Sequence, residues 1–424
     1  MFNHGEDPPL HKSKTNSKET KLYAISLSGS IAQNLIWVYV PYFAIALGAS
    51  YSEQGLITSV RTLGNSLTQS LWGTQSDKHG RRPVLIFGYA ILALTAFFFT
   101  LTAQLNLSLF LGLVAIQGFC GYAVVTGGVW NSTLGDIALE RERGAVLGKI
   151  ISFGVFGSVP VIILFGYLID RQGLTGPSQY NIVFLSACVV IALTILLIFI
   201  LKETLQKKPL EALPPLWRII RQHRKFRRFL TIDVMYIFFL AMMWPLFPFV
   251  IKEVVHANNA QLSIIWAIWM CFMAIGQKFG GTLSDRLGRR PLLIFSRSIM
   301  FLVPLLFGLS ARWPLWQLLL IAQCFGGIGW GLSLLLENMI ALDLAPTDQK
   351  ALFTGTTFTF TGIASFMGAL ISGTITQILT AYMGQLSGLV MMLYILAAIR
   401  LILGLAHVLI AETAPVKRNK VTIG

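Results

Sequence analysis

Long apolar stretches alternate with short polar segments along almost the whole chain. A helix that crosses a lipid bilayer needs about 20 mostly apolar residues, and punctuation by charged and Gly/Pro-containing segments separates twelve stretches of about that length. They lie at 22–48, 54–76, 84–103, 108–135, 145–169, 181–201, 229–252, 261–283, 292–310, 315–342, 352–380 and 385–411. The pattern therefore predicts an all-α membrane protein with twelve transmembrane helices.

The composition favours the same class. Hydrophobic residues make up 55% of the 424-residue chain and charged residues only 12%, whereas a soluble protein carries about 25% charged residues. A disordered chain, a secreted disulfide scaffold and an ordinary cytosolic enzyme are thereby excluded. The stretch 22–48 is longer than the core of a signal peptide, which is about 7–15 residues, so we expect it to be retained as the first span. The four cysteines lie inside apolar stretches without a CxxC pair, which favours packing thiols over a disulfide or a metal site.

Basic residues are distributed unevenly between the predicted sides of the membrane. Lys and Arg number 33 against 18 Asp and Glu, a formal net charge of +15. With the N-terminus inside, 27 of these basic residues lie in the tails and loops on the inner side and three in the outer loops. Cytoplasmic loops carry such an excess. The asymmetry predicts that both termini are cytoplasmic, at a cell membrane, and it explains the basic charge without a nucleic-acid partner.

The longest polar segment divides the spans six and six. We expect a cytoplasmic tail at 1–21, a six-helix bundle at 22–201, a basic linker at 202–228, a second bundle at 229–411 and a tail at 412–424. The linker is either a solvated connection or, in part, a basic helix that lies on anionic lipid headgroups.

A fifteen-residue segment occurs twice. The sequence from Gly73 to Phe87 recurs from Gly281 to Phe295 at an offset of 208, with eleven identical positions. Weaker echoes relate Asn131 to Asn338 at an offset of 207, and Glu203-Thr204 to Glu412-Thr413 at 209. Two six-helix units in the same orientation, a parallel repeat, would produce this pattern.

The repeated segment joins spans 2 and 3, and spans 8 and 9, on the predicted cytoplasmic side. Its glycines permit positive φ in a tight turn, and its arginines present planar donors to carboxylates on neighbouring loops. We interpret these charges as a latch that holds the two halves together and releases when they rock; the alternative is plain topology anchoring. The predicted latch comprises Gly73, Asp77, Gly80, Arg81, Arg82, Asp136, Glu142, Arg143, Gly281, Asp285, Gly288, Arg289, Arg290 and Asp343.

The motif Gly-x-x-x-Asp-(Arg/Lys)-x-Gly-Arg-Arg after span 2, echoed after span 8, resembles the signature loop of the major facilitator superfamily. Asp136 with Glu142-Arg143-Gly144 looks like the second cytoplasmic signature of that family, and Glu203-Thr204 and Glu412-Thr413 look like its endings of spans 6 and 12. The resemblance covers the whole chain. It implies two six-helix bundles around a central cavity and alternating access by rocking, without ATP.

Of the ionisable residues inside predicted spans, three are our main functional candidates, because a charge within the bilayer is costly; Arg400, in the peripheral last span, is a weaker one. Arg61, in the outer half of span 2, is a candidate for binding an anionic group of a substrate; the alternatives are snorkelling and pairing with Glu53. Glu337, interpreted as the only carboxylate well inside a span, is a candidate for binding a proton or a substrate amine. Lys278 is predicted at a similar depth. The alternative to a functional role for these two residues is therefore a static ion pair between Lys278 and Glu337. Arg297 is expected to snorkel to the inner surface.

Polar side chains inside the spans complete the candidate substrate site. Gln33, Asn34, Asn131 and Asn338 could line a water-filled cavity or join helices by hydrogen bonds. No nucleotide-binding or metalloprotease motif occurs, so we expect neither enzymatic activity nor a cofactor. The sequence favours a secondary transporter of a small organic solute, expected to be proton-coupled and monomeric, with an anionic or zwitterionic substrate. The alternatives are efflux of hydrophobic or amphipathic compounds and a non-transporting sensor on the same fold.

Overall fold

The computed structural model describes residues 9–101, 106–126, 128–137, 143–201, 220–346 and 349–413. Within these ranges it describes all side chains except those of 9–19, 128, 135–137, 143–147 and 351. The described chain is helical and contains no strand. Nine of its helical segments are long and apolar enough to cross a membrane.

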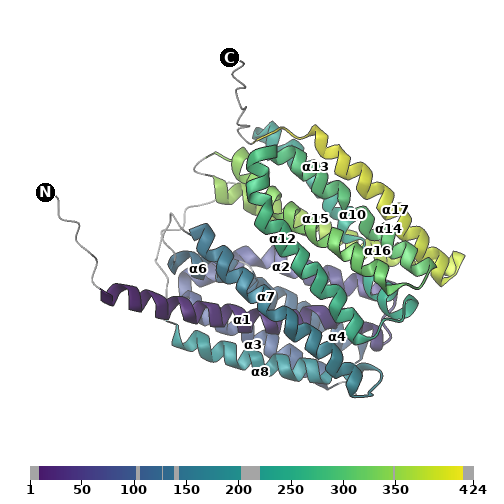
Figure 1. Cartoon of the computed structure of the whole chain (residues 1–424), viewed down its shortest axis with the longest axis horizontal. Helices are drawn as coiled ribbons and strands as arrows, with labels where there is room; N and C mark the ends of the chain where they lie inside the picture. The colour runs from purple at the N-terminus through teal and green to yellow at the C-terminus, as the bar shows by residue number, and fades with distance from the viewer. Residues whose placement is uncertain are drawn as a thin grey trace, which may run out of the picture.

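Helices occupy all twelve stretches that the apolar pattern predicts. The N-terminal group consists of α1 (Pro9–Ala46), α2 (Tyr51–His79), α3 (Arg81–Thr100), α4 (Leu107–Ile116), η2 (Gln117–Tyr122), α5 (Ala123–Val125), α6 (Gly128–Ile137), α7 (Arg143–Arg171), η3 (Pro177–Tyr180) and α8 (Asn181–Ile200). The C-terminal group consists of α10 (Arg224–Ala241), α11 (Phe247–Phe249), η4 (Val250–Val254), α12 (Asn259–Leu287), α13 (Arg289–Ile299), α14 (Leu302–Arg312), α15 (Trp316–Leu344), α16 (Lys350–Met383), α17 (Gln385–Ala406) and η5 (His407–Leu409). Figure 1 shows the two groups as separate bundles, purple to teal and green to yellow.

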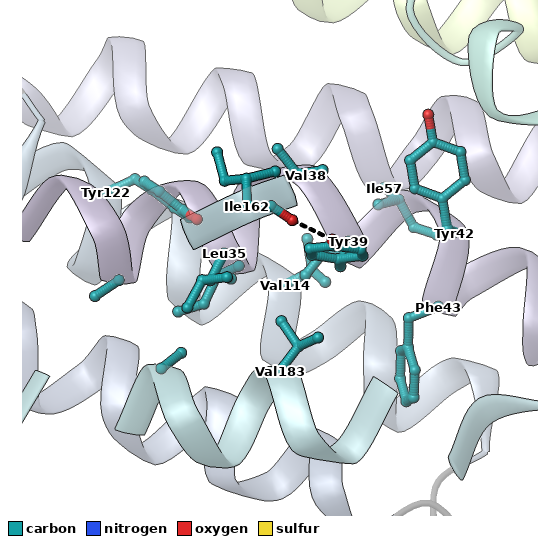
Figure 2. Packing of buried hydrophobic residues seen from close by; sticks show 14 of the residues in the cluster. Leu35, Val38, Tyr39, Tyr42, Phe43, Ile57, Val114, Tyr122, Ile162 and Val183 are labelled. Carbon is teal, nitrogen blue, oxygen red and sulfur yellow. Dashed lines mark hydrogen bonds between the residues drawn. The ribbon is translucent and has the colours of Figure 1, made fainter. Parts of the chain in front are cut away.

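Helix α1 forms the centre of the N-terminal bundle, where it packs against α7 and α8. Figure 2 shows buried side chains of α1, including Leu35 and Phe43, together with Val114, Ile162 and Val183 of neighbouring helices. The hydroxyl of Tyr39 donates to the carbonyl oxygen of Ile162 on α7 at 3.1 Å, the dashed line of Figure 2. Because lipid is as apolar as leucine, such close packing and buried hydrogen bonds hold membrane helices together.

The two bundles contact each other mainly through two helix pairs, α2 with α16 and α7 with α12, and α1 adds contacts to α11 and α12. At one end the contact between α2 and α16 is close: a Cβ atom on Gly55 would lie 2.7 Å from the carbonyl oxygen of Ala369. Ser59 Oγ donates to the carbonyl oxygen of Phe366 at 2.8 Å. We call this end, which contains the start of α2 and the end of α7, the closed end.

Helix α12 is joined at the same end to α1, which carries Tyr39 and Tyr42, and to α7, which carries Asp170. The Tyr39 hydroxyl lies 2.7 Å from Ser263 Oγ on α12, and Trp266 Nε1 donates to the Tyr42 hydroxyl at 3.1 Å. Asp170, at the end of α7, accepts hydrogen bonds from the backbone N–H groups of Asn259 and Ala260 at 3.0 and 2.8 Å. A carboxylate placed on the first turn of a helix satisfies N–H groups that have no partner within the helix.

At the opposite end the same helices diverge. Cβ atoms built on Gly73 of α2 and Gly355 of α16 would meet no atom within 4 Å, and the same holds for Gly148 of α7 and Gly281 of α12. Figure 1 shows the bundles spreading toward the side where the two chain ends leave them. We call this the open end; the two repeated loops lie there.

Candidate functional site

A hollow of about 150 Å³ opens in the N-terminal bundle. Three of the four polar residues that the sequence nominates for a substrate site, Gln33, Asn34 and Asn131, lie in its wall together. The hollow is lined by Ser26, Ser30, Gln33, Asn34, Tyr89, Val125, Thr126, Trp130, Asn131, Ile151 and Val155.

The amides of the hollow differ in how strongly their neighbours hold them. Gln33 Nε2 donates to the Tyr89 hydroxyl at 3.2 Å, and Asn34 Nδ2 donates to Ser158 Oγ at 2.8 Å. The Asn131 side chain is exposed. Amides and a phenol supply both donors and acceptors, so the hollow can recognise polar groups of a small solute on one face and aromatic or aliphatic surface on the other. Asn338, the repeat counterpart of Asn131, donates to the carbonyl oxygen of Leu334 in its own helix at 3.0 Å.

Arg61 packs against two aromatic rings, those of Trp37 and Tyr122, near this hollow. Its guanidinium carbon is 3.5 Å from the centre of the Trp37 ring and 4.4 Å from that of Tyr122. The residue is only 5% exposed, and its Nε and Nη2 atoms have no hydrogen-bond partner among the described residues. Glu53 caps its own helix through Ser50, so the structure does not pair it with Arg61. A buried guanidinium between two ring faces is a cation–π arrangement.

The structure does not form the pair between Lys278 and Glu337. Lys278 is exposed, with its Nζ 5.8 Å from the centre of the Phe279 ring. Glu337 Oε2 instead accepts from Arg297 Nη2 at 3.1 Å. The spacing predicts a similar depth for the two residues, but each residue turns the helix by about 100°, and depth alone does not give the face.

Two residues that form a buried charged cluster with Glu337, Arg297 and Asp233, were not identified from the sequence. Arg297 was expected to snorkel, yet its side chain is fully buried, and its Nη2 also donates to Asp233 Oδ1 at 2.6 Å. Glu337 is therefore not the only carboxylate deep in a span. Asp233 seemed close to a helix end because the span was expected to begin at 229; α10 begins at Arg224, which places Asp233 more than two turns inside it.

The repeated loop of the C-terminal bundle forms several of the predicted contacts. Gly288 has φ 92°, and Arg289 forms an ion pair with Asp343, a partner that the sequence nominates. Glu412 accepts from the backbone N–H groups of Arg289 and Arg290 at 3.0 and 3.1 Å. The carboxylate of Glu412, in the repeated Glu-Thr pair, thus caps α13. Asp285 is exposed.

The N-terminal copy turns in the same way, with Gly80 at φ 104°. Asp77 pairs with Arg81 at 2.6 Å, and Arg81 also donates to Ser76 Oγ at 2.6 Å. The guanidinium of Arg82 lies 5.1 Å from the centre of the Phe199 ring. The side chains of the predicted latch residues Asp136, Glu142 and Arg143 lie outside those described. The ion pairs Asp77–Arg81 and Arg289–Asp343 each lie within a single bundle.

Comparison with known proteins decides the family. The sequence model of the Major Facilitator Superfamily matches residues 22–368 and, in a second match, 234–423. The chain belongs to this superfamily. It is a transporter and an integral membrane protein, so the family and the fold class that the sequence predicts are confirmed.

Relatives within the superfamily differ in what their names say they carry. The multidrug resistance protein MdtL of Shewanella oneidensis is 25% identical over 70% of this chain and 74% of its own. Citrate exporter 1 of Aspergillus niger is 28% identical over 37% of this chain and 29% of its own.

Solved structures share the fold at low identity. The xylose transporter XylE of E. coli aligns with a TM-score of 0.68 at 14% identity, covering 94% of this chain and 99% of its own. The nucleoside transporter NupG aligns with a TM-score of 0.67 at 15% identity, covering 92% of this chain and 98% of its own.

Proposed function

We propose that this protein is a proton-coupled secondary transporter of a small organic solute in the plasma membrane, with both termini in the cytoplasm. Its moving units are the bundles 22–201 and 229–411, joined by the basic segment 202–228. The observation that carries the proposal is the one-sided contact between the bundles. Polar and glycine contacts join them at one end. At the other end, Cβ atoms on Gly73, Gly148, Gly281 and Gly355 would meet no atom within 4 Å, and a polar hollow opens in the bundle wall.

The orientation follows from charge. The open end holds the repeated loops, whose arginines belong to the basic excess that faces the cytoplasm in membrane proteins. The arrangement is then an inward-facing state, and rocking about the hollow would close the open end and part the closed one. We also propose that the transporter works as a monomer.

The substrate that we favour is anionic or zwitterionic. Arg61 supports this choice: it is a buried positive charge with two unpartnered nitrogens, and Tyr122, whose ring it touches, donates to the carbonyl oxygen of Gln33 in the wall of the hollow. In a medium of low dielectric constant an unpaired charge acts strongly on a nearby ligand. The aromatic and aliphatic part of the lining, and the multidrug relatives, support the alternative of amphipathic efflux substrates.

A thermal-shift experiment separates the two. Purified protein is heated with citrate or with ethidium, a lipophilic cation, alongside Arg61→Ala and Arg61→Lys. A ligand at about 100 times its dissociation constant stabilises the folded state by about 2.7 kcal/mol. A shift with citrate that Arg61→Ala abolishes and Arg61→Lys partly keeps supports the anion proposal. A shift with ethidium alone, unchanged in Arg61→Ala, supports efflux. Binding without flux in proteoliposomes would favour a sensor.

A further inference from the structure

Two carboxylates in the C-terminal bundle share one guanidinium nitrogen. Arg297 Nη2 lies 2.6 Å from Asp233 Oδ1 and 3.1 Å from Glu337 Oε2. The three side chains come from α13, α10 and α15, which pack together in the green-to-yellow bundle of Figure 1. The side chains of Arg297 and Asp233 are fully buried, and that of Glu337 is 9% exposed.

The bonding within this cluster is uneven. Arg297 Nε and Nη1 and Asp233 Oδ2 have no hydrogen-bond partner among the described residues. Since both carboxylates use the same nitrogen, their bonded oxygens can be no farther apart than the sum of the two distances. Two carboxylates so close in a buried site repel each other when both are ionised, and such pairs characteristically hold a proton between them.

Three more groups face the cluster. His407 Nδ1 lies 2.8 Å from the carbonyl oxygen of Leu403, so this nitrogen carries the hydrogen; its Nε2 lies 3.8 Å from Asp233 Oδ1. The Tyr236 hydroxyl donates to the carbonyl oxygen of Arg297 at 2.8 Å, and its ring centre lies 4.5 Å from the guanidinium carbon.

The remaining charge is Arg400 on α17. It is 2% exposed, and its Nη1 contacts Met243 Sδ at 3.2 Å. With both carboxylates ionised and His407 neutral, these charges sum to zero. Uptake of one proton leaves a single positive charge.

The internal repeat relates this cluster to the hollow of the other bundle. At the offset of 208 Arg297 corresponds to Tyr89, and at the offset of 207, which relates Asn338 to Asn131, Glu337 corresponds to Trp130. Tyr89 and Trp130 both line the hollow. The position that is open for a solute in one bundle is therefore filled by a charged cluster in the other.

We propose that Glu337 is the residue that binds and releases the coupling proton. The inference rests on the proposed function, because it assumes that transport occurs. Glu337 has the longer bond to Arg297 and is the member of the carboxylate pair that is not fully buried, whereas Asp233 is enclosed with a short bond and His407 beside it. Water delivers the proton to an oxygen of Glu337, after which Arg297 pairs with Asp233 alone. The proton returns to water when Glu337 ionises again.

The first experiment needs no substrate. Infrared spectra of the purified protein are recorded from mildly acidic to alkaline pH, and the carbonyl stretch of protonated carboxylic acids is followed. We expect a titrating band that is lost in Glu337→Gln and retained in Asp233→Asn and His407→Gln. Glu53→Gln, which removes a carboxylate from the closed end, is the matched control. A band that survives Glu337→Gln, or no titrating carboxyl band in the wild-type protein, overturns the proposal. Gel filtration and a melting curve verify that each variant is folded.

The second experiment tests coupling. Radiolabelled citrate and ethidium are the probes, each followed in proteoliposomes with and without a pH gradient. We expect the gradient to stimulate movement of at least one probe in the wild-type protein. In Glu337→Gln we expect the rate with the gradient to equal that variant's own rate without a gradient. Stimulation that persists in Glu337→Gln overturns the proposal. If neither probe moves but the infrared band behaves as expected, the proposed substrate class fails while the proton site stands.

Discussion

The carboxylate of Asp170 caps the helix that begins at Asn259. Asp170 Oδ1 lies 3.0 Å from the backbone nitrogen and 2.8 Å from the side-chain Nδ2 of Asn259. Asp170 ends α7 in one bundle and Asn259 begins α12 in the other, so this cap joins the two units that alternating access must separate. Hydrogen bonds to a charged group are worth about 1.5–3 kcal/mol, which makes the pair a leading contribution to the stability of the closed end.

Asp170→Asn should open the closed end more often. The amide retains at most one acceptor oxygen and has no charge to interact with the helix dipole. A loss of about 1.4 kcal/mol shifts the ratio of the two states roughly tenfold. Spin labels at Gln172 and Tyr382, introduced as cysteines into a variant without the four native cysteines, would report a new population of longer distances. Glu53→Gln, which weakens a cap within one bundle, should leave the distances unchanged; an equal response of both variants would contradict the assignment.

Gly55→Ala should destabilise the inward-facing state. Its Cβ would lie 2.7 Å from the Ala369 carbonyl oxygen and 3.1 Å from the Gly373 Cα, and overpacking of this kind costs about 1–3 kcal/mol. Gly73→Ala on the same helix is the matched control, because its Cβ meets nothing within 4 Å, and it should gain up to about 1 kcal/mol from helix propensity. Melting temperatures of the two variants should therefore move in opposite directions. A fall in both would show that the bundles also meet at Gly73.

Glu412→Gln should destabilise the C-terminal bundle. The substitution removes the charge that accepts from the backbone N–H groups of Arg289 and Arg290, and loss of a helix cap costs about 0.5–2 kcal/mol. The measurement is thermal denaturation in detergent. Glu253→Gln, at an exposed position, serves as the comparison and should change the melting temperature little. The cap would be refuted by identical melting of both variants and the wild-type protein.

Asn131→Ala should weaken solute binding without affecting stability. Its side chain is exposed in the wall of the hollow, so truncation leaves no packed neighbour behind, whereas loss of one hydrogen bond to a solute costs about 0.5–1.5 kcal/mol. The thermal shift produced by whichever probe stabilises the wild-type protein should need a roughly fivefold higher concentration. Asn338→Ala, at the repeat-related position but bonded within its own helix, should keep the wild-type response. Equal loss in both would place the solute between the bundles.

The fold could be predicted because its causes are local along the chain. Apolar length sets each span, and the repeated loop reveals the two units before any contact is known. The pair between Arg289 and Asp343 could also be anticipated, because the predicted spans place both residues just beyond a span end on the same side of the membrane. The positive φ at Gly80 and Gly288 was equally readable, since a tight turn between two helices demands it.

The interior charges could not be assigned from sequence because their partners depend on the face of each helix. The spacing predicts a similar depth for Lys278 and Glu337, yet Lys278 is exposed and Glu337 is bonded to Arg297, which reaches inward instead of toward the headgroups. The contacts of the closed end, such as that between Tyr39 and Ser263, were missed for a related reason. They join helices of different bundles, and no pattern within either helix reveals which surfaces meet.

The hydrogen bonds of the closed end determine how easily it can part. The groups that cross between the bundles there include the hydroxyls of Tyr39, Ser59 and Ser263 and the carboxylate of Asp170. When such groups separate at the end of a bundle, water can enter and replace each partner, so the net cost of every bond is small compared with its strength in a dry interior. A seam of interlocked leucines would lose its contacts without any such compensation. Water can thus replace the broken hydrogen bonds of the closed end, a property suited to a barrier that must form and open in every transport cycle.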